Sequence, residues 1–122
     1  MDRKAIRDAL FPDCPVRNVL SRMTDKWTLL VLYTLEHNET LRFNDIRRAI
    51  PDISQKSLTV TLKSMEADGL VTRKVTPSVP VKVEYSLTQR AKSLMPILDE
   101  LLSWSLDHFS GIISDRQKHS QE

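Results

Sequence analysis

One face of a predicted helix over about residues 54–68 carries side chains that could read DNA bases. Lysine donates hydrogen bonds to guanine or phosphate, glutamine pairs with adenine, and a small apolar group contacts the methyl of thymine. The opposite face carries Leu58, Leu62 and Met65 at helical spacing, so one side would be buried and the other would face a major groove. The residues predicted to contact bases are Gln55, Lys56, Thr59, Val60 and Lys63.

The same polar face would suit an ordinary core helix with a solvated outer side, so the flanking elements must decide. Ser54 is expected to cap the helix by accepting a hydrogen bond from a free backbone N–H, and Gly69 to end it in a left-handed conformation. A shorter helix over residues 45–50 precedes it, capped by Asn44 and ended by Pro51. Two short helices joined by a tight turn predict a helix-turn-helix.

Residues 70–87 are expected to form a two-stranded β-hairpin, the wing, because apolar residues alternate on both sides of a proline-containing tip. Cations on this hairpin and on the shorter helix are placed to contact the DNA backbone. A solvated hairpin would carry the same charges, so charge alone does not prove the contact. The residues predicted to contact the backbone are Arg47, Arg48, Ser54, Arg73, Lys74 and Lys82.

The distribution of charge supports this interpretation more than the total does. The net charge of the 122 residues is only +2. Residues 42–82 contain eight Lys/Arg and four Asp/Glu, which gives +4 there and leaves −2 for the rest of the chain. A basic excess around a groove-reading helix is the expected footprint of a nucleic-acid-binding protein.

The other predicted helices provide a core and a surplus apolar surface. A helix over residues 26–37 is apolar nearly all round and should be the buried centre. The last helix, over about residues 89–113, has more apolar surface than one small domain can bury, with a kink or local break expected at Pro96. We expect this helix to form a homodimer interface and residues 114–122 to be a disordered tail. The interface residues predicted are Leu98, Leu101 and Trp104.

Composition indicates a single globular domain over residues 1–122, mainly α with a small β-hairpin (an α+β fold). No apolar run is long enough to span a bilayer and no signal peptide opens the chain, so we expect a cytoplasmic protein with no membrane partner. The histidines are scattered, and neither metal-ligand spacing nor a phosphate-binding glycine loop occurs. We therefore expect no metal, no cofactor and no enzymatic activity.

Cys14 is the only cysteine, which excludes an intrachain disulfide. It precedes Pro15 at a predicted helix start with Arg17 one turn along, and both features would lower the pKa of a thiol and favour its reaction with an oxidant or electrophile. The alternative is that Cys14 is an inert, small apolar residue. It is accordingly a candidate redox sensor.

Several short motifs, in order and at fitting spacing, make the chain resemble the HxlR family of bacterial winged helix-turn-helix transcriptional regulators, relatives of the MarR group. The resemblance runs from about Cys14 to Trp104 and includes Asp25-Lys26-Trp27-Thr28, Ile53-Ser54-Gln55-Lys56, Glu66-Ala67-Asp68-Gly69-Leu70-Val71 and Val83-Glu84-Tyr85-Ser86-Leu87-Thr88. It implies a homodimer joined through its N- and C-terminal helices, with one recognition helix per subunit in the major groove of an inverted repeat. It also implies oxidant or electrophile sensing at Cys14 as in several members.

Two other functions fit the same pattern. A winged-helix module could bind another protein through its polar face, and salt-sensitive binding to duplex DNA would separate that function from DNA recognition. A regulator gated by a small-molecule ligand would share the fold and differ only in its trigger.

Overall fold

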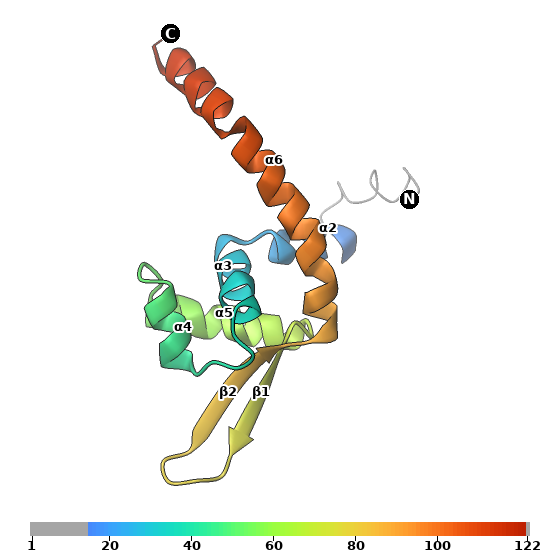
Figure 1. Ribbon diagram of the computed structural model, residues 1–122, viewed down its shortest axis with the longest axis vertical. Coiled ribbons are helices and arrows are strands. Elements are labelled where there is room, and N and C mark those ends of the chain that lie inside the picture. Colours follow the sequence, from blue (N-terminus) through green and yellow to red (C-terminus); the bar gives the residue numbers. More distant parts are fainter. Residues whose placement is uncertain (1–14, 122) are drawn as a thin grey trace.

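The computed structural model describes residues 15–121, so Cys14 lies outside the described part of the chain. The fold is a winged helix-turn-helix, mainly α with one hairpin, which confirms the predicted fold class. The elements follow in the order α2 (Pro15–Met23), α3 (Lys26–Glu36), α4 (Phe43–Ala49), α5 (Gln55–Ala67), β1 (Val71–Thr76), β2 (Lys82–Leu87) and α6 (Gln89–Ser120) (Figure 1).

Helix α3 is the buried centre, as its apolar composition predicts. Asp25 caps its start by accepting a hydrogen bond from the backbone N–H of Thr28 at 3.1 Å. Val31, Leu32 and Leu35 are buried, and the helix packs against α4, α5, α6 and strand β2. Helices α4 and α5 and the hairpin are thus packed around one apolar helix.

Helix α4 begins earlier than predicted, and Asn44 is not its cap. The helix starts at Phe43 after the N-cap residue Arg42, and the Asp45 carboxylate accepts the Arg42 backbone N–H at 3.1 Å. An acid at the third helical position that binds back to the cap residue stabilises this earlier start. Ile46 and Ile50 turn into the core, as expected.

The wing is the antiparallel pair β1–β2, in the register Val71 with Leu87 through to Thr76 with Lys82. Leu41 joins the sheet through a single bridge to Tyr85, with hydrogen bonds of 3.0 and 2.8 Å in the two directions. The hairpin therefore projects from a base that the segment before α4 holds in place (Figure 1).

Helix α6 is longer than predicted. It continues through Pro96 without a break and ends at Ser120, so the predicted end near residue 113 and the disordered tail are wrong. Adding residues to an existing helix needs no new nucleation, and the last turns contain good helix formers such as Arg116 and Lys118. Among the described residues, no helix combines the length and apolarity needed to cross a membrane.

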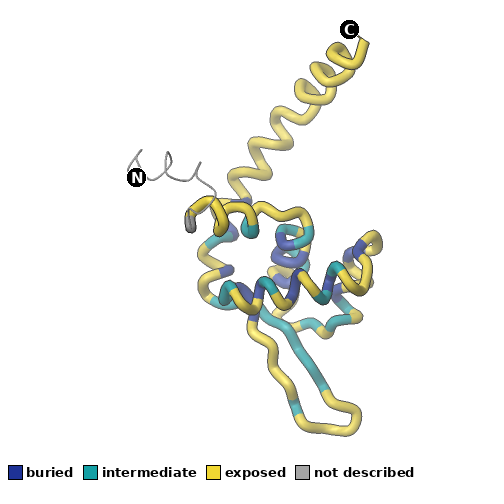
Figure 2. The backbone as a smooth tube through the Cα atoms, turned by 180° about the vertical axis from the view of Figure 1, so that it is seen from behind, coloured by how far each residue is buried: buried dark blue, intermediate teal, exposed yellow. Residues whose placement is uncertain are grey.

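Only the first part of α6 belongs to the compact body. Ala91, Met95 and Leu98 are buried there, whereas the residues that follow Leu98 are exposed (Figure 2). About two thirds of this helix, residues 99–120, is therefore a rod that buries no side chain against the described part of the protomer.

Candidate nucleic-acid interface

Helix α5 presents one face to the core and the other to solvent, as the sequence predicts. Leu58, Leu62 and Met65 are buried. Ser54 caps the first turn by accepting the backbone N–H of Ser57 at 3.0 Å, and Gly69 follows the helix with a φ of 71°. Both helix ends thus lie where the predicted capping residues stand.

The structure brings the five predicted base-contacting residues together on the outer side of α5. Gln55, Lys56 and Lys63 are exposed, and Val60 is 59% exposed. Thr59 is half-buried and its hydroxyl donates to the Gln55 carbonyl at 2.9 Å, which leaves the hydroxyl oxygen as an acceptor. This face offers donors, acceptors and one apolar group to a partner.

The predicted backbone-contacting residues surround this face but differ in their local pairing. Arg48 forms an ion pair with Asp45 inside α4, and Lys82 lies 3.6 Å from the carboxylate of Glu84. The remaining four residues are all exposed: Arg47, Ser54, Arg73 and Lys74. The Ser54 hydroxyl oxygen already accepts the capping hydrogen bond of α5.

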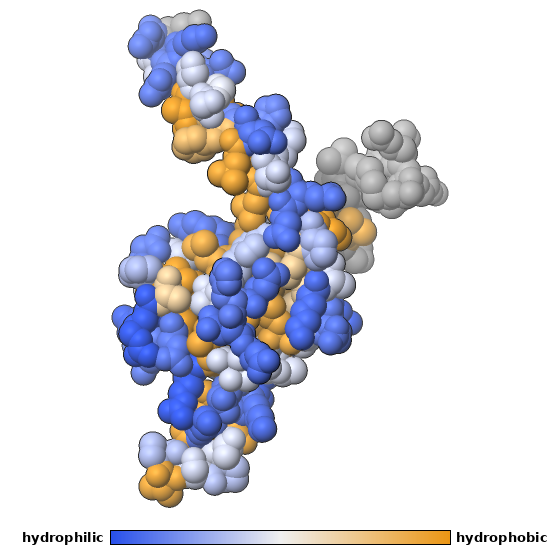
Figure 3. All heavy atoms as spheres, viewed as in Figure 1, coloured by the Kyte–Doolittle hydropathy of each residue, from blue (hydrophilic) through white to orange (hydrophobic). Residues whose placement is uncertain are grey.

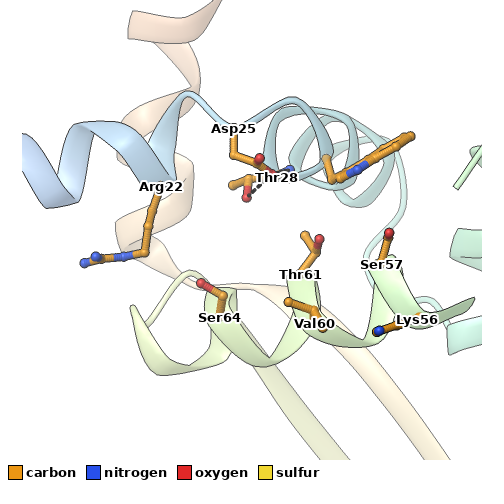
Figure 4. A pocket seen from close by; sticks show the side chains of 9 residues that line it. Arg22, Asp25, Thr28, Lys56, Ser57, Val60, Thr61 and Ser64 are labelled. Carbon is orange, nitrogen blue, oxygen red and sulfur yellow. Dashed lines mark hydrogen bonds between the residues drawn. The ribbon is translucent and has the colours of Figure 1, made fainter. Parts of the chain in front are cut away.

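Two hollows flank α5. One lies toward the wing, has a volume of about 410 Å³, and is lined by Lys63 together with Arg73 and Tyr85 of the hairpin. The other lies between α5 and the start of α3, has a volume of about 570 Å³, and is lined by residues that include Trp27 and Ser57 (Figure 4). The exposed face of α5 is therefore bordered on both sides by a recess that carries both apolar and charged side chains.

The C-terminal end of α5 is held by two arginines that sequence analysis did not identify. Arg22 of α2 donates from Nε to the Asp68 carboxylate at 2.7 Å, and Arg90 of α6 donates to the Asp68 carbonyl at 2.9 Å. The hydrogen bond with Asp68 raises the pKa of Arg22. Arg22 and Asp68 are 46 residues apart, so no local pattern could have paired them.

The predicted dimer residues fall into two groups. Leu98 is 3% exposed and packs in the core of its own protomer, so it leaves almost no surface for a contact with a second copy. Leu101 and Trp104 lie beyond the body and are 47% and 55% exposed. Large apolar side chains continue along the rod (Figure 3): Leu102, Leu106, Phe109, Ile112 and Ile113 are also exposed.

Comparison with known proteins supports the resemblance to the HxlR family. The family pattern of the HxlR-like helix-turn-helix matches residues 22–111. An uncharacterized HTH-type transcriptional regulator of Halalkalibacterium halodurans is 46% identical over 94 residues, which cover 77% of this chain and 83% of the relative.

Solved structures agree. The reduced form of the transcriptional regulator YodB from B. subtilis has 36% identity and a TM-score of 0.69, over 79% of this chain and 93% of YodB. The redox regulator HypR in its reduced form has 38% identity and a TM-score of 0.70, over 82% of this chain and 98% of HypR. The curated relatives are regulators and not enzymes, in agreement with the expected lack of enzymatic activity. The chain belongs to the HxlR family of helix-turn-helix transcriptional regulators.

Proposed function

We propose that this regulator binds an inverted-repeat DNA operator as a homodimer, with the α5 helix of each protomer in a major groove. The observation that carries the proposal is the exposed face of α5, which places Gln55, Lys56 and Lys63 beside an exposed apolar side chain. Amide, ammonium and apolar groups on one helix face match the donors, acceptors and methyl groups of base edges. Arg47 and the wing cations Arg73 and Lys74 supply backbone contacts on its flank.

Two arguments support the proposed homodimer, the symmetry of an inverted repeat and the rod of α6. An inverted repeat requires two recognition helices related by a two-fold axis, at half-sites about one helical turn apart. The exposed apolar side chains of α6, with Leu101 and Trp104 among them, would be covered by the same helix of a second copy.

A selection from random duplexes with the full chain tests the proposal. We expect an enriched inverted repeat, bound with an affinity that falls steeply as salt is raised, because each neutralised phosphate releases counterions. If no sequence is enriched, and if duplex DNA is not bound or is bound independently of salt, DNA recognition would be contradicted and a protein-interaction module favoured. A sequence-specific affinity that one class of added small molecule changes would identify ligand gating.

We further propose that oxidation at Cys14 alters operator binding. The first described helix, α2, begins at Pro15, and the similar protein HypR is a redox regulator. With no second cysteine in the chain, diamide would take two electrons and two protons from two Cys14 thiols and leave an intersubunit disulfide. Such a bond would shift the two recognition helices relative to each other.

We expect diamide to change the operator affinity of the wild type and to leave that of Cys14→Ser unchanged. Binding measured with and without diamide, followed by reduction with dithiothreitol, checks this. Equal, oxidant-independent affinities of the two proteins would mean that Cys14 is not a sensor.

A further inference from the structure

We propose that Lys26, at the start of α3, binds a backbone phosphate of the operator strand that runs along the side of α5 facing away from the wing. The inference rests on the proposed function, and it assigns a contact to a residue that the sequence pattern leaves unassigned.

A helix in the major groove lies between two sugar-phosphate strands. On the wing side of α5, the hollow lined by Lys63 and Arg73 provides two cations for one of these strands. The opposite hollow contains none of the predicted backbone-contacting residues. It does contain Lys56 and Val60 of the base-reading face, so a strand that follows α5 on this side would pass the hollow's edge (Figure 4).

Lys26 is an exposed cation next in sequence to Trp27, which lines this hollow, and its ammonium lies over the indole ring. Its Nζ lies 4.1 Å from the centroid of the Trp27 ring, which lines the hollow and packs against the hydrophobic core. A cation over an indole face is attracted by the ring, so the long side chain has less freedom to lose when it binds. The ammonium keeps donors for a phosphate oxygen because a ring face occupies only one side of it.

The other groups around the hollow favour an anion at its mouth. Lys56 adds a second positive charge, and Ser57 and Ser64 add hydroxyls. Arg22 also lines the hollow, but its guanidinium is paired with Asp68. The opposing charge is Asp25, but its carboxylate accepts hydrogen bonds from the Thr28 backbone N–H at 3.1 Å and the Thr28 hydroxyl at 3.4 Å. Because Asp25 already caps α3, the proposed contact is the Lys26 ammonium and not the helix end.

The test is operator binding by Lys26→Gln over a range of salt concentrations. The slope of log K against log salt should flatten by about 0.9 for each lost phosphate contact, or about 1.8 for a dimer with one Lys26 on each half-site. At about 0.1 M salt the affinity should fall roughly three- to tenfold, equally for operator and unrelated duplex. Lys26→Arg should retain the slope, and Lys118→Gln, near the far end of α6, is the matched control (Figure 1).

Phosphate-ethylation interference supplies a second readout. We expect one ethylation-sensitive phosphate per half-site, on the strand away from the wing, to become insensitive in Lys26→Gln while the other sensitive positions persist. A wild-type slope and an unchanged interference pattern in Lys26→Gln would overturn the inference but not the proposed function, which Lys56 tests separately. A loss of sequence preference in Lys26→Gln would also overturn it, because a backbone contact carries no base specificity.

Discussion

Replacing both Leu101 and Trp104 by glutamate should convert the protein to a monomer and lower its operator affinity by about 10²–10⁴-fold, because the second half-site is then no longer bound intramolecularly. Both side chains lie on the rod of α6 beyond the last core residue, Leu98, and about half of each is exposed. A buried, unpaired carboxylate at a helix–helix interface is strongly unfavourable. The protomer core does not include these two positions, so the monomer should still fold, with a melting temperature below that of the dimer because association stabilises the folded state.

Sedimentation of the double variant at micromolar concentration measures the effect. The control is Ser103→Glu, which adds one carboxylate on a stripe of the helix that already carries Glu100 and Asp107. We expect the control to stay dimeric. A wild type that sediments as a monomer, or a double variant that remains dimeric, would contradict the α6 interface.

The second large effect is expected from the base-reading face of α5. Lys56→Ala and Gln55→Ala should each weaken operator binding by about 1–3 kcal/mol per base contact and relax the preference at the contacted base pair. Both residues are exposed, so the substitutions leave the buried face of the helix intact. Lys74→Ala, on the exposed side of the wing, is the control: it should weaken all sequences alike and flatten the salt dependence.

The recognition helix could be predicted from the sequence because its signals are local. Ser54 and Gly69 mark its ends within one turn, and the spacing of Leu58, Leu62 and Met65 defines its buried face. The hairpin is local in the same sense, since its strands are adjacent in sequence.

Features that depend on distant parts of the chain could not be predicted in this way. Leu98 and Leu101 lie on one apolar stripe, and only the packed body shows that the first is core and the second is not. The Arg22–Asp68 pair joins segments far apart in sequence. The hollow beside Trp27 forms only when α3 and α5 are packed together.

The most direct test of the central claim, that α5 reads the operator, combines protein and base substitutions. Affinities of wild type and Lys56→Ala are measured for the operator and for duplexes changed at each half-site position. We expect one position at which the base change is costly for the wild type and nearly neutral for Lys56→Ala, a coupling of about 1–3 kcal/mol. If the two proteins show the same affinity and the same preference at every position, α5 does not read the operator through Lys56.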